Sequence, residues 1–197
     1  PMYIKDVRPQ VKDIDIRKID GIDENYSVRN AWKLMKELDV VTLPILEENR
    51  LKGLVTIGDV AKSYFEMYDS DILSVAHTSL RNIVDTLSGE IVTGDPDKIF
   101  EKGKMLIAAA NPDMMESFIE KGDLVILGNR YESQLCAIEM EAACIIVCEG
   151  APVSLTIRKL AQARGCTIIS TPYDAFTVAR LINQSIPVEF FMRTDHL

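Results

Sequence analysis

The sequence predicts an α/β fold made of two parts. In the first part, the segments read helix, strand, turn, strand, helix. In the second part, continuous apolar strands alternate with capped helices, which is typical of a mostly parallel sheet covered on both faces. Hydrophobic residues make up 47% of the 197 residues, enough to bury a core.

A helix is predicted over residues 28–38, VRNAWKLMKEL, where Ser27 can serve as the N-cap. Its apolar residues recur at helical spacing, so one face should be buried. That face would consist of Ala31, Leu34, Met35 and Leu38. Two short apolar strands follow over 40–46 and 51–56, and the polar EENR between them predicts a turn.

The second strand ends in GLVTIGDV and runs directly into a helix predicted over 58–68. The residues expected to be buried on that helix are Val60, Ala61, Tyr64 and Phe65. Thr56, Gly58 and Asp59 lie at the joint, where unpaired backbone N–H groups attract anions. Thr56 can bind a phosphate, Gly58 permits close backbone approach, and Asp59 can accept from two ribose hydroxyls. On spacing alone, these residues form either a nucleotide-monophosphate corner or an ordinary helix cap.

The second part should contain five strands and five helices. The strands are expected at 90–94, 104–109, 124–128, 144–149 and 167–171. The helices are expected at 80–87, 111–122, 132–142, 152–165 and 174–184. Ser79 can cap the first of these helices. Asn111 can cap the second, with Pro112 in its first turn and Gly122 at its end.

Composition excludes several classes of protein. The net charge of −8 argues against a nucleic-acid surface or an anionic membrane surface, because both need a basic face. The longest apolar runs are too short to span a bilayer. No signal peptide opens the chain, and its start, PMYIKDV, is expected to be a cut inside a longer protein. The four cysteines are expected to be buried, reduced thiols, so the predicted location is cytoplasmic.

The chain is not expected to be catalytic by itself. Its two histidines, His77 and His196, are too few and too far apart in sequence for a dimetal hydrolase, so we predict no metal site. Neither a phosphate-binding G-x-x-x-x-G-K-[ST] loop nor a G-x-S-x-G nucleophile motif occurs. These features favour a sensor over a catalyst.

Residues 1–74 resemble a CBS motif, the paired small domain that senses adenosine nucleotides. The resemblance rests on SVRNAWKLMKELDVVTLPILEENRLKGLVTIGDVAKSYF, with its capped helix, its VTLPIL strand containing Pro44 and its T-x-x-D joint. It implies a β-α-β-β-α fold. It also implies that Thr56, with Gly58 beside it, contacts the phosphate and that Asp59 contacts the ribose. A single motif would leave its helix faces partly bare, so we expect a homodimer.

CBS motifs work in pairs, and each nucleotide site uses residues of both. The segment 188–197, VEFFMRTDHL, resembles the incomplete start of a second motif. The residues that would complete the site with Thr56 and Asp59 are Arg193, Thr194, Asp195 and His196. The alternative is that this segment is only a frayed terminus.

Residues 75–187 resemble a DRTGG domain, with NRYES in place of the motif that gives the domain its name. The order CBS motif, DRTGG domain, CBS motif is similar to the regulatory insert of family II inorganic pyrophosphatases. That resemblance implies inhibition by AMP or ADP and activation by ATP or diadenosine polyphosphates. The flanking catalytic domains of the parent chain would use Mn²⁺ or Co²⁺, with Mg²⁺. The alternative is a dimerisation or sensor module attached to a different enzyme or a transcription regulator.

Overall fold

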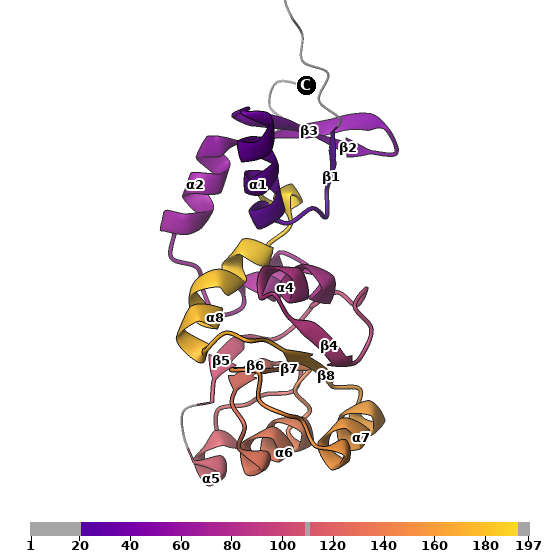
Figure 1. The fold of residues 1–197 in the computed structure, drawn as a ribbon, viewed down its shortest axis with the longest axis vertical. Helices are drawn as coiled ribbons and strands as arrows, with labels where there is room; N and C mark the ends of the chain where they lie inside the picture. Colours follow the sequence, from indigo (N-terminus) through magenta and orange to yellow (C-terminus); the bar gives the residue numbers. More distant parts are fainter. Residues whose placement is uncertain (1–20, 109–110, 193–197) are drawn as a thin grey trace, which may run out of the picture.

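The structure, a computed structural model, describes residues 21–108 and 111–192. Two units follow one another along the long axis of the molecule (Figure 1). The first unit is a three-stranded sheet with α1 and α2 against one face. The second unit is a five-stranded sheet between two layers of helices.

The elements of the first unit agree with the β-α-β-β-α order expected from the sequence. They are β1 (Ile22–Asp23), α1 (Val28–Leu38), β2 (Thr42–Glu47), β3 (Arg50–Thr56) and α2 (Ile57–Phe65). β2 pairs in parallel with β1 and antiparallel with β3. The turn between β2 and β3 places Glu48 and Asn49 in the left-handed region, as a tight two-residue hairpin requires. Ser27 caps α1 as predicted, because its Oγ accepts the Asn30 N–H at 3.1 Å.

The buried faces of the two helices differ in part from the prediction. On α1, Ala31 and Met35 are buried as expected, but Leu34 is half-buried and Leu38 is exposed. On α2, only Val60 of the predicted set is buried. The prediction was wrong for Ala61, Tyr64 and Phe65, which are exposed. Apolar spacing predicts which face of a helix can pack against other residues, but not that such residues are present. In the described structure, only Asp59, Val60 and Ser63 of α2 are buried.

The described residues of the second unit form six α-helices, of which the first, α3, was not predicted. Its elements are α3 (Ile72–Val75), α4 (Leu80–Thr86), β4 (Glu90–Thr93), β5 (Met105–Ile107), α5 (Pro112–Met115), β6 (Leu124–Leu127), α6 (Tyr131–Glu139), β7 (Cys144–Val147), α7 (Leu155–Arg164), β8 (Thr167–Ser170) and α8 (Ala175–Leu181). The strand order is β4-β8-β7-β6-β5. All neighbours are parallel except β4 and β8, so the mostly parallel sheet is confirmed.

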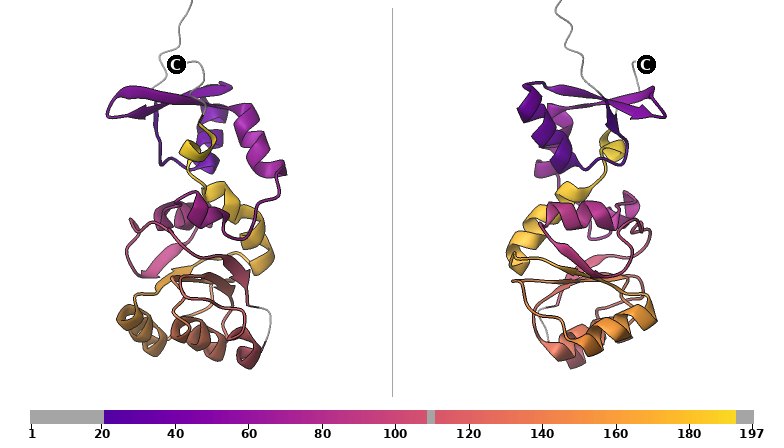
Figure 2. Two further views of the ribbon diagram at one scale, coloured as in Figure 1. Left: turned by 180° about the vertical axis from the view of Figure 1, so that it is seen from behind. Right: turned by 45° about the vertical axis from the view of Figure 1, so that its right-hand side comes forward.

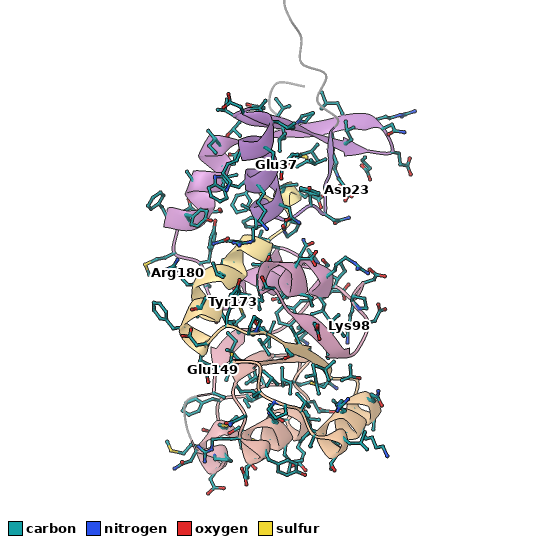
Figure 3. The ribbon with its side chains drawn as sticks, in the orientation of Figure 1. Asp23, Glu37, Lys98, Glu149, Tyr173 and Arg180 are labelled. Atoms are coloured by element: carbon teal, nitrogen blue, oxygen red, sulfur yellow. The ribbon has the colours of Figure 1, made fainter. Side chains whose placement is uncertain are left out.

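Helices cover this sheet on both faces. α5, α6 and α7 lie on one side, and α4 and α8 lie on the other, toward the first unit (Figures 1 and 2). Alternate residues of β7 enter the two cores, with Ile146 on the α4 and α8 side and Ile145 on the side of α6 and α7. Beyond the strand ends, Glu149 and Tyr173 lie at one edge of the sheet (Figure 3), where the Glu149 N–H donates to the Tyr173 carbonyl at 2.8 Å.

The helix predicted over residues 111–122 forms only one turn, α5, and Asn111 makes no side-chain cap. After Met115 the chain forms a turn, in which the Ser117 and Phe118 N–H groups donate to the carbonyls three residues back. The buried carboxylate of Asp123 then accepts the Glu120 N–H at 2.8 Å, so that amide does not join a helix either. The same carboxylate accepts the backbone N–H and the ammonium of Lys104, which joins the starts of β5 and β6.

The chain crosses between the units twice. After α2 it enters α3, whose Ile72 and Leu73 are buried in the core of the second unit, so the boundary expected after residue 74 falls inside α3. After α8 a 3₁₀ turn, Ile182–Ser185, leads back, and Val188 is buried in the core of the first unit. The chain thus re-enters the core of the first unit directly after Pro187.

The cysteines are buried and unpaired, as predicted: Cys136, Cys144, Cys148 and Cys166. Within residues 21–108 and 111–192, no helix combines the length and the hydropathy needed to cross a membrane.

Candidate functional site

The strand-to-helix joint between β3 and α2 is closed by a reciprocal capping box. Thr56 is the N-cap of α2, and its Oγ1 accepts the Asp59 N–H at 3.2 Å. In return, the Asp59 carboxylate accepts the Thr56 N–H at 2.7 Å and the Thr56 hydroxyl at 2.9 Å. The helix-cap geometry left open by the sequence is therefore present, and the two side chains that could meet a nucleotide already touch each other.

One backbone donor at this joint is unpaired within the described part of the chain. The Ile57 N–H donates to the Val41 carbonyl at 2.8 Å, and the Asp59 N–H is bound by Thr56. The N–H of Gly58, which lies between them, has no hydrogen-bond partner among the described residues. An unpaired N–H at the start of a nine-residue helix is a suitable donor for an anion.

The space around Gly58 is open. A Cβ added there would meet only the Thr56 Oγ1, at 3.5 Å, which is an ordinary contact, and the backbone of Gly58 is not left-handed. The fold itself therefore does not require glycine at this position. A requirement for Gly58 would have to come from a bound molecule that approaches its backbone closely.

The three residues differ in exposure. Asp59 is 3% exposed, Thr56 is half-buried and Gly58 is on the surface. A buried carboxylate needs hydrogen-bond donors, and Thr56 supplies two of them. Hydroxyl groups of a ligand would have to compete for this carboxylate with the donors that already bind it.

The other predicted site residues, Arg193, Thr194, Asp195 and His196, lie outside the described residues. The segment that leads to them is described. It forms a 3₁₀ turn, Val188–Phe191, in which Val188 is fully buried in the core of the first unit. Phe191 and Met192 pack against the same core.

The motif NRYES lies in the other unit. Asn129 and Arg130 precede α6, are exposed, and are not brought to the joint between β3 and α2. Sequence reasoning also missed the contacts between the units. Arg29 binds Gln184 across 155 residues of sequence, and no local pattern signals such a pair. In the described part of the chain, no group of three or more His, Cys, Asp and Glu side chains is placed to hold a metal ion.

Comparison with known families assigns both units. A family model for the DRTGG domain matches residues 82–185, and one for the CBS domain matches residues 11–66. The CBS and DRTGG resemblances drawn from the sequence are thereby confirmed.

Curated relatives extend well beyond this chain. The "Cobalt-dependent inorganic pyrophosphatase" of Clostridium perfringens is 34% identical over all of this chain and 36% of its own length. The "Probable manganese-dependent inorganic pyrophosphatase" of Thermotoga maritima is 27% identical over 98% of this chain and 35% of its own length. The chain thus spans about a third of these relatives.

A solved structure has the same fold. It contains the CBS and DRTGG domains of the regulatory region of Clostridium perfringens pyrophosphatase, complexed with the activator diadenosine tetraphosphate. The identity is 35% and the TM-score is 0.89. The match covers 96% of this chain and 83% of that one.

Proposed function

The chain belongs to the family of regulatory regions that join a CBS domain to a DRTGG domain, and from this premise we propose that it senses adenine nucleotides for an inorganic pyrophosphatase. The observation that carries the proposal is the N–H of Gly58, which has no partner among the described residues and lies in sequence between the mutually capped Thr56 and Asp59. A phosphate oxygen can accept from that N–H, and also from the Thr56 hydroxyl once this hydroxyl turns away from Asp59, while ribose hydroxyls donate to Asp59.

The ligands in this proposal are AMP, ADP, ATP and diadenosine polyphosphates. The related regulatory region was solved with diadenosine tetraphosphate, which is named there as an activator. By analogy, diadenosine polyphosphates or ATP would activate, and AMP or ADP would inhibit. The difference between activation and inhibition would follow from which conformation each ligand binds more tightly.

The remainder of the nucleotide site would come from the segment after Met192. Because Val188, Phe191 and Met192 pack against the core of the first unit, the chain re-enters that unit before Arg193. We infer that residues 193–196 complete the site, with Arg193 and His196 as candidate cationic partners for phosphate.

Hydrolysis of pyrophosphate would belong to flanking catalytic domains of the parent chain. The names of the relatives indicate Mn²⁺ or Co²⁺ as their metals, and Mg²⁺ would accompany the substrate. Four buried, unpaired thiols fit a reducing compartment, so the proposed location is the cytoplasm.

A second copy of the chain is the proposed macromolecular partner. The first unit exposes Tyr64 and Phe65 at the end of α2, and Met67 directly after it. Phe65 is 87% exposed, which is unusual for an aromatic side chain on a helix that otherwise packs against a core. Such a face is suited to an isologous contact with its own copy.

Calorimetric titration of the full-length protein tests the proposal. AMP and diadenosine tetraphosphate should bind, GMP should bind much more weakly, and the bound adenine nucleotides should change the rate of pyrophosphate hydrolysis. Absence of adenine nucleotide binding, or equal binding of GMP, would contradict it.

A further inference from the structure

The chain's return to the first unit forms a short antiparallel ladder with the segment before α1. The Val28 N–H donates to the Ile186 carbonyl at 2.9 Å, and the Val188 N–H donates to the Tyr26 carbonyl at 2.8 Å. Ser27 and Pro187 are bridge partners at its centre. We call residues 24–28 and 186–189 the seam ladder.

Asn82 of α4, in the second unit, is hydrogen-bonded to this ladder and to the residue directly before its second segment. Its side-chain amino group donates to the Asn25 carbonyl at 2.8 Å and to the Ser185 carbonyl at 3.2 Å. One amide NH₂ has two donors, and both are used here, one at the first unit and one at the returning chain. Asn82 is thus bonded to both sides of the junction.

Two further contacts fix the ladder at its ends. The Arg29 Nη1 in the first turn of α1 donates to the Gln184 Oε1 at 2.7 Å, and Gln184 is buried. At the opposite end, Lys52 of β3 binds the carboxylates of Glu24 and Glu189. Hydrogen bonds to these carboxylates raise the pKa of Lys52.

The other crossing between the units, residues 66–71, makes fewer hydrogen bonds among the described residues. Its side chains are exposed except that of Tyr68, which packs against the core of the second unit and meets the Phe190 ring edge-to-face. The Ser70 carbonyl accepts the Met105 N–H at 2.8 Å. The start of α1 is thus hydrogen-bonded to the second unit and to the returning chain, whereas α2 leads into a segment attached mainly through Tyr68 and Ser70 (Figure 1).

We propose that Asn82 is a positioning residue that latches the start of α1 to the second unit. The second unit and α1 then move as one body, and α2, with the Thr56–Asp59 joint at its start, is the element that shifts against them. A ligand at that joint would change the relation of α2 to the latched body. This last step rests on the proposed nucleotide function; the latch itself does not.

Hydrogen exchange of the individual amides in this chain tests the latch without any nucleotide. Asn82→Ala removes two hydrogen bonds. Because a hydrogen bond is worth about 1 kcal/mol, the Val28 and Val188 amides should exchange roughly five- to tenfold faster. The Ile145 and Ile146 amides in β7 should keep their protection. Asn82→Asp sets a carboxylate against two carbonyl oxygens, so it should accelerate exchange at the ladder still more.

Asn30→Ala is the matched control. Asn30 lines the same cavity of about 390 Å³ as Asn82, and its side chain makes no hydrogen bond to the described residues. This variant should leave the exchange of Val28 and Val188 unchanged. Unchanged exchange at these two amides in both Asn82 variants would overturn the latch, as would equal acceleration throughout both units.

The nucleotide step is tested in the full-length protein. Asn82→Ala should bind diadenosine tetraphosphate with an affinity within about threefold of the parent's. The ligand should nevertheless lose most of its effect on the rate of hydrolysis, because binding is no longer coupled to the second unit. A full response in Asn82→Ala would overturn the transmission role. If the unmodified protein binds no adenine nucleotide, the proposed function fails, while the exchange result still decides the latch.

Discussion

The Thr56 hydroxyl and the Asp59 carboxylate meet at 2.9 Å at the start of α2, each also bound to the other's backbone N–H. This arrangement has two consequences. It fixes the side chains in place before any ligand arrives, which lowers the entropic cost of binding. It also means that a change at either residue weakens the helix cap, so such a variant needs a control that removes a cap elsewhere, and a variant that leaves this cap intact should be measured beside it.

Gly58→Ala is that variant. The added methyl meets only the Thr56 Oγ1 at 3.5 Å, and alanine is the better helix former. The free energy of unfolding should therefore stay the same or rise by up to about 1 kcal/mol, while AMP binding weakens about tenfold or more because the methyl occupies ligand space. Gly128→Ala, where the methyl meets nothing within 4 Å, is the control for both measurements. Unchanged AMP affinity in Gly58→Ala would place the phosphate elsewhere.

The exposed end of α2 predicts self-association. Sedimentation of the chain at tens of micromolar should show a dimer, and Phe65→Glu should shift it to monomer, because a charge cannot be buried unpaired at low cost. Near-UV circular dichroism should show that the fold is kept. Phe118→Glu, at an aromatic residue that is 56% exposed in the second unit, should remain dimeric. A monomeric parent chain, or a dimeric Phe65→Glu, would contradict this interface.

Asp123 predicts a local effect on stability. Its carboxylate, 1% exposed, accepts from the Lys104 ammonium, the Lys104 N–H and the Glu120 N–H. Asp123→Ala should lower the free energy of unfolding by about 3 kcal/mol, since it removes three hydrogen bonds to one buried, charged acceptor. Glu120→Ala removes only an exposed carboxylate 3.9 Å from Lys104 and should cost under about 0.5 kcal/mol. Urea denaturation compares the two, and equal losses would refute the assignment.

The buried thiols predict loss of stability in alkali. Burial raises the pKa of Cys166 to about 12 and of Cys148 to about 11, from an ordinary value near 9. Above pH 9 the unfolded thiols ionise while the folded ones keep their protons. The unfolding free energy should therefore fall as pH rises from 9 toward 11, by up to about 1.4 kcal/mol per pH unit for each thiol. Denaturation at several pH values should show a flatter fall for Cys166→Ala, and an equally steep fall would contradict this cause.

Local signals in the sequence predicted much of the fold. Ser27 and Ser79 each cap the helix that follows, because a hydroxyl before an apolar helical pattern satisfies a nearby N–H. The continuous apolar strands were equally clear, since a parallel sheet buries both faces. These features depend on neighbours within a few residues.

The missed features have no signal in the apolar spacing. In place of the rest of the helix predicted over 111–122, the chain has a turn over 116–118 and a bond from the Glu120 N–H to Asp123, and the pattern of 111–122 does not distinguish these from a continuous helix. The exposed Phe65 has apolar spacing typical of a core, yet its cover is not in the described chain. For the site, the sequence identified the joint at Thr56 and Asp59 but not their mutual capping bonds.

The affinity for AMP of the full-length protein carrying Asp59→Ala tests the nucleotide account most directly. Loss of a charged acceptor for the ribose hydroxyls costs on the order of 1.5–3 kcal/mol, so calorimetry should show AMP binding about ten- to hundredfold weaker. Asp174→Ala is the control, because Asp174 also caps a helix, accepting the Thr177 N–H at 2.7 Å, but in the second unit. That variant should bind AMP as the parent does. If Asp59→Ala also binds AMP with the parent's affinity, Asp59 is only a helix cap and the nucleotide lies elsewhere.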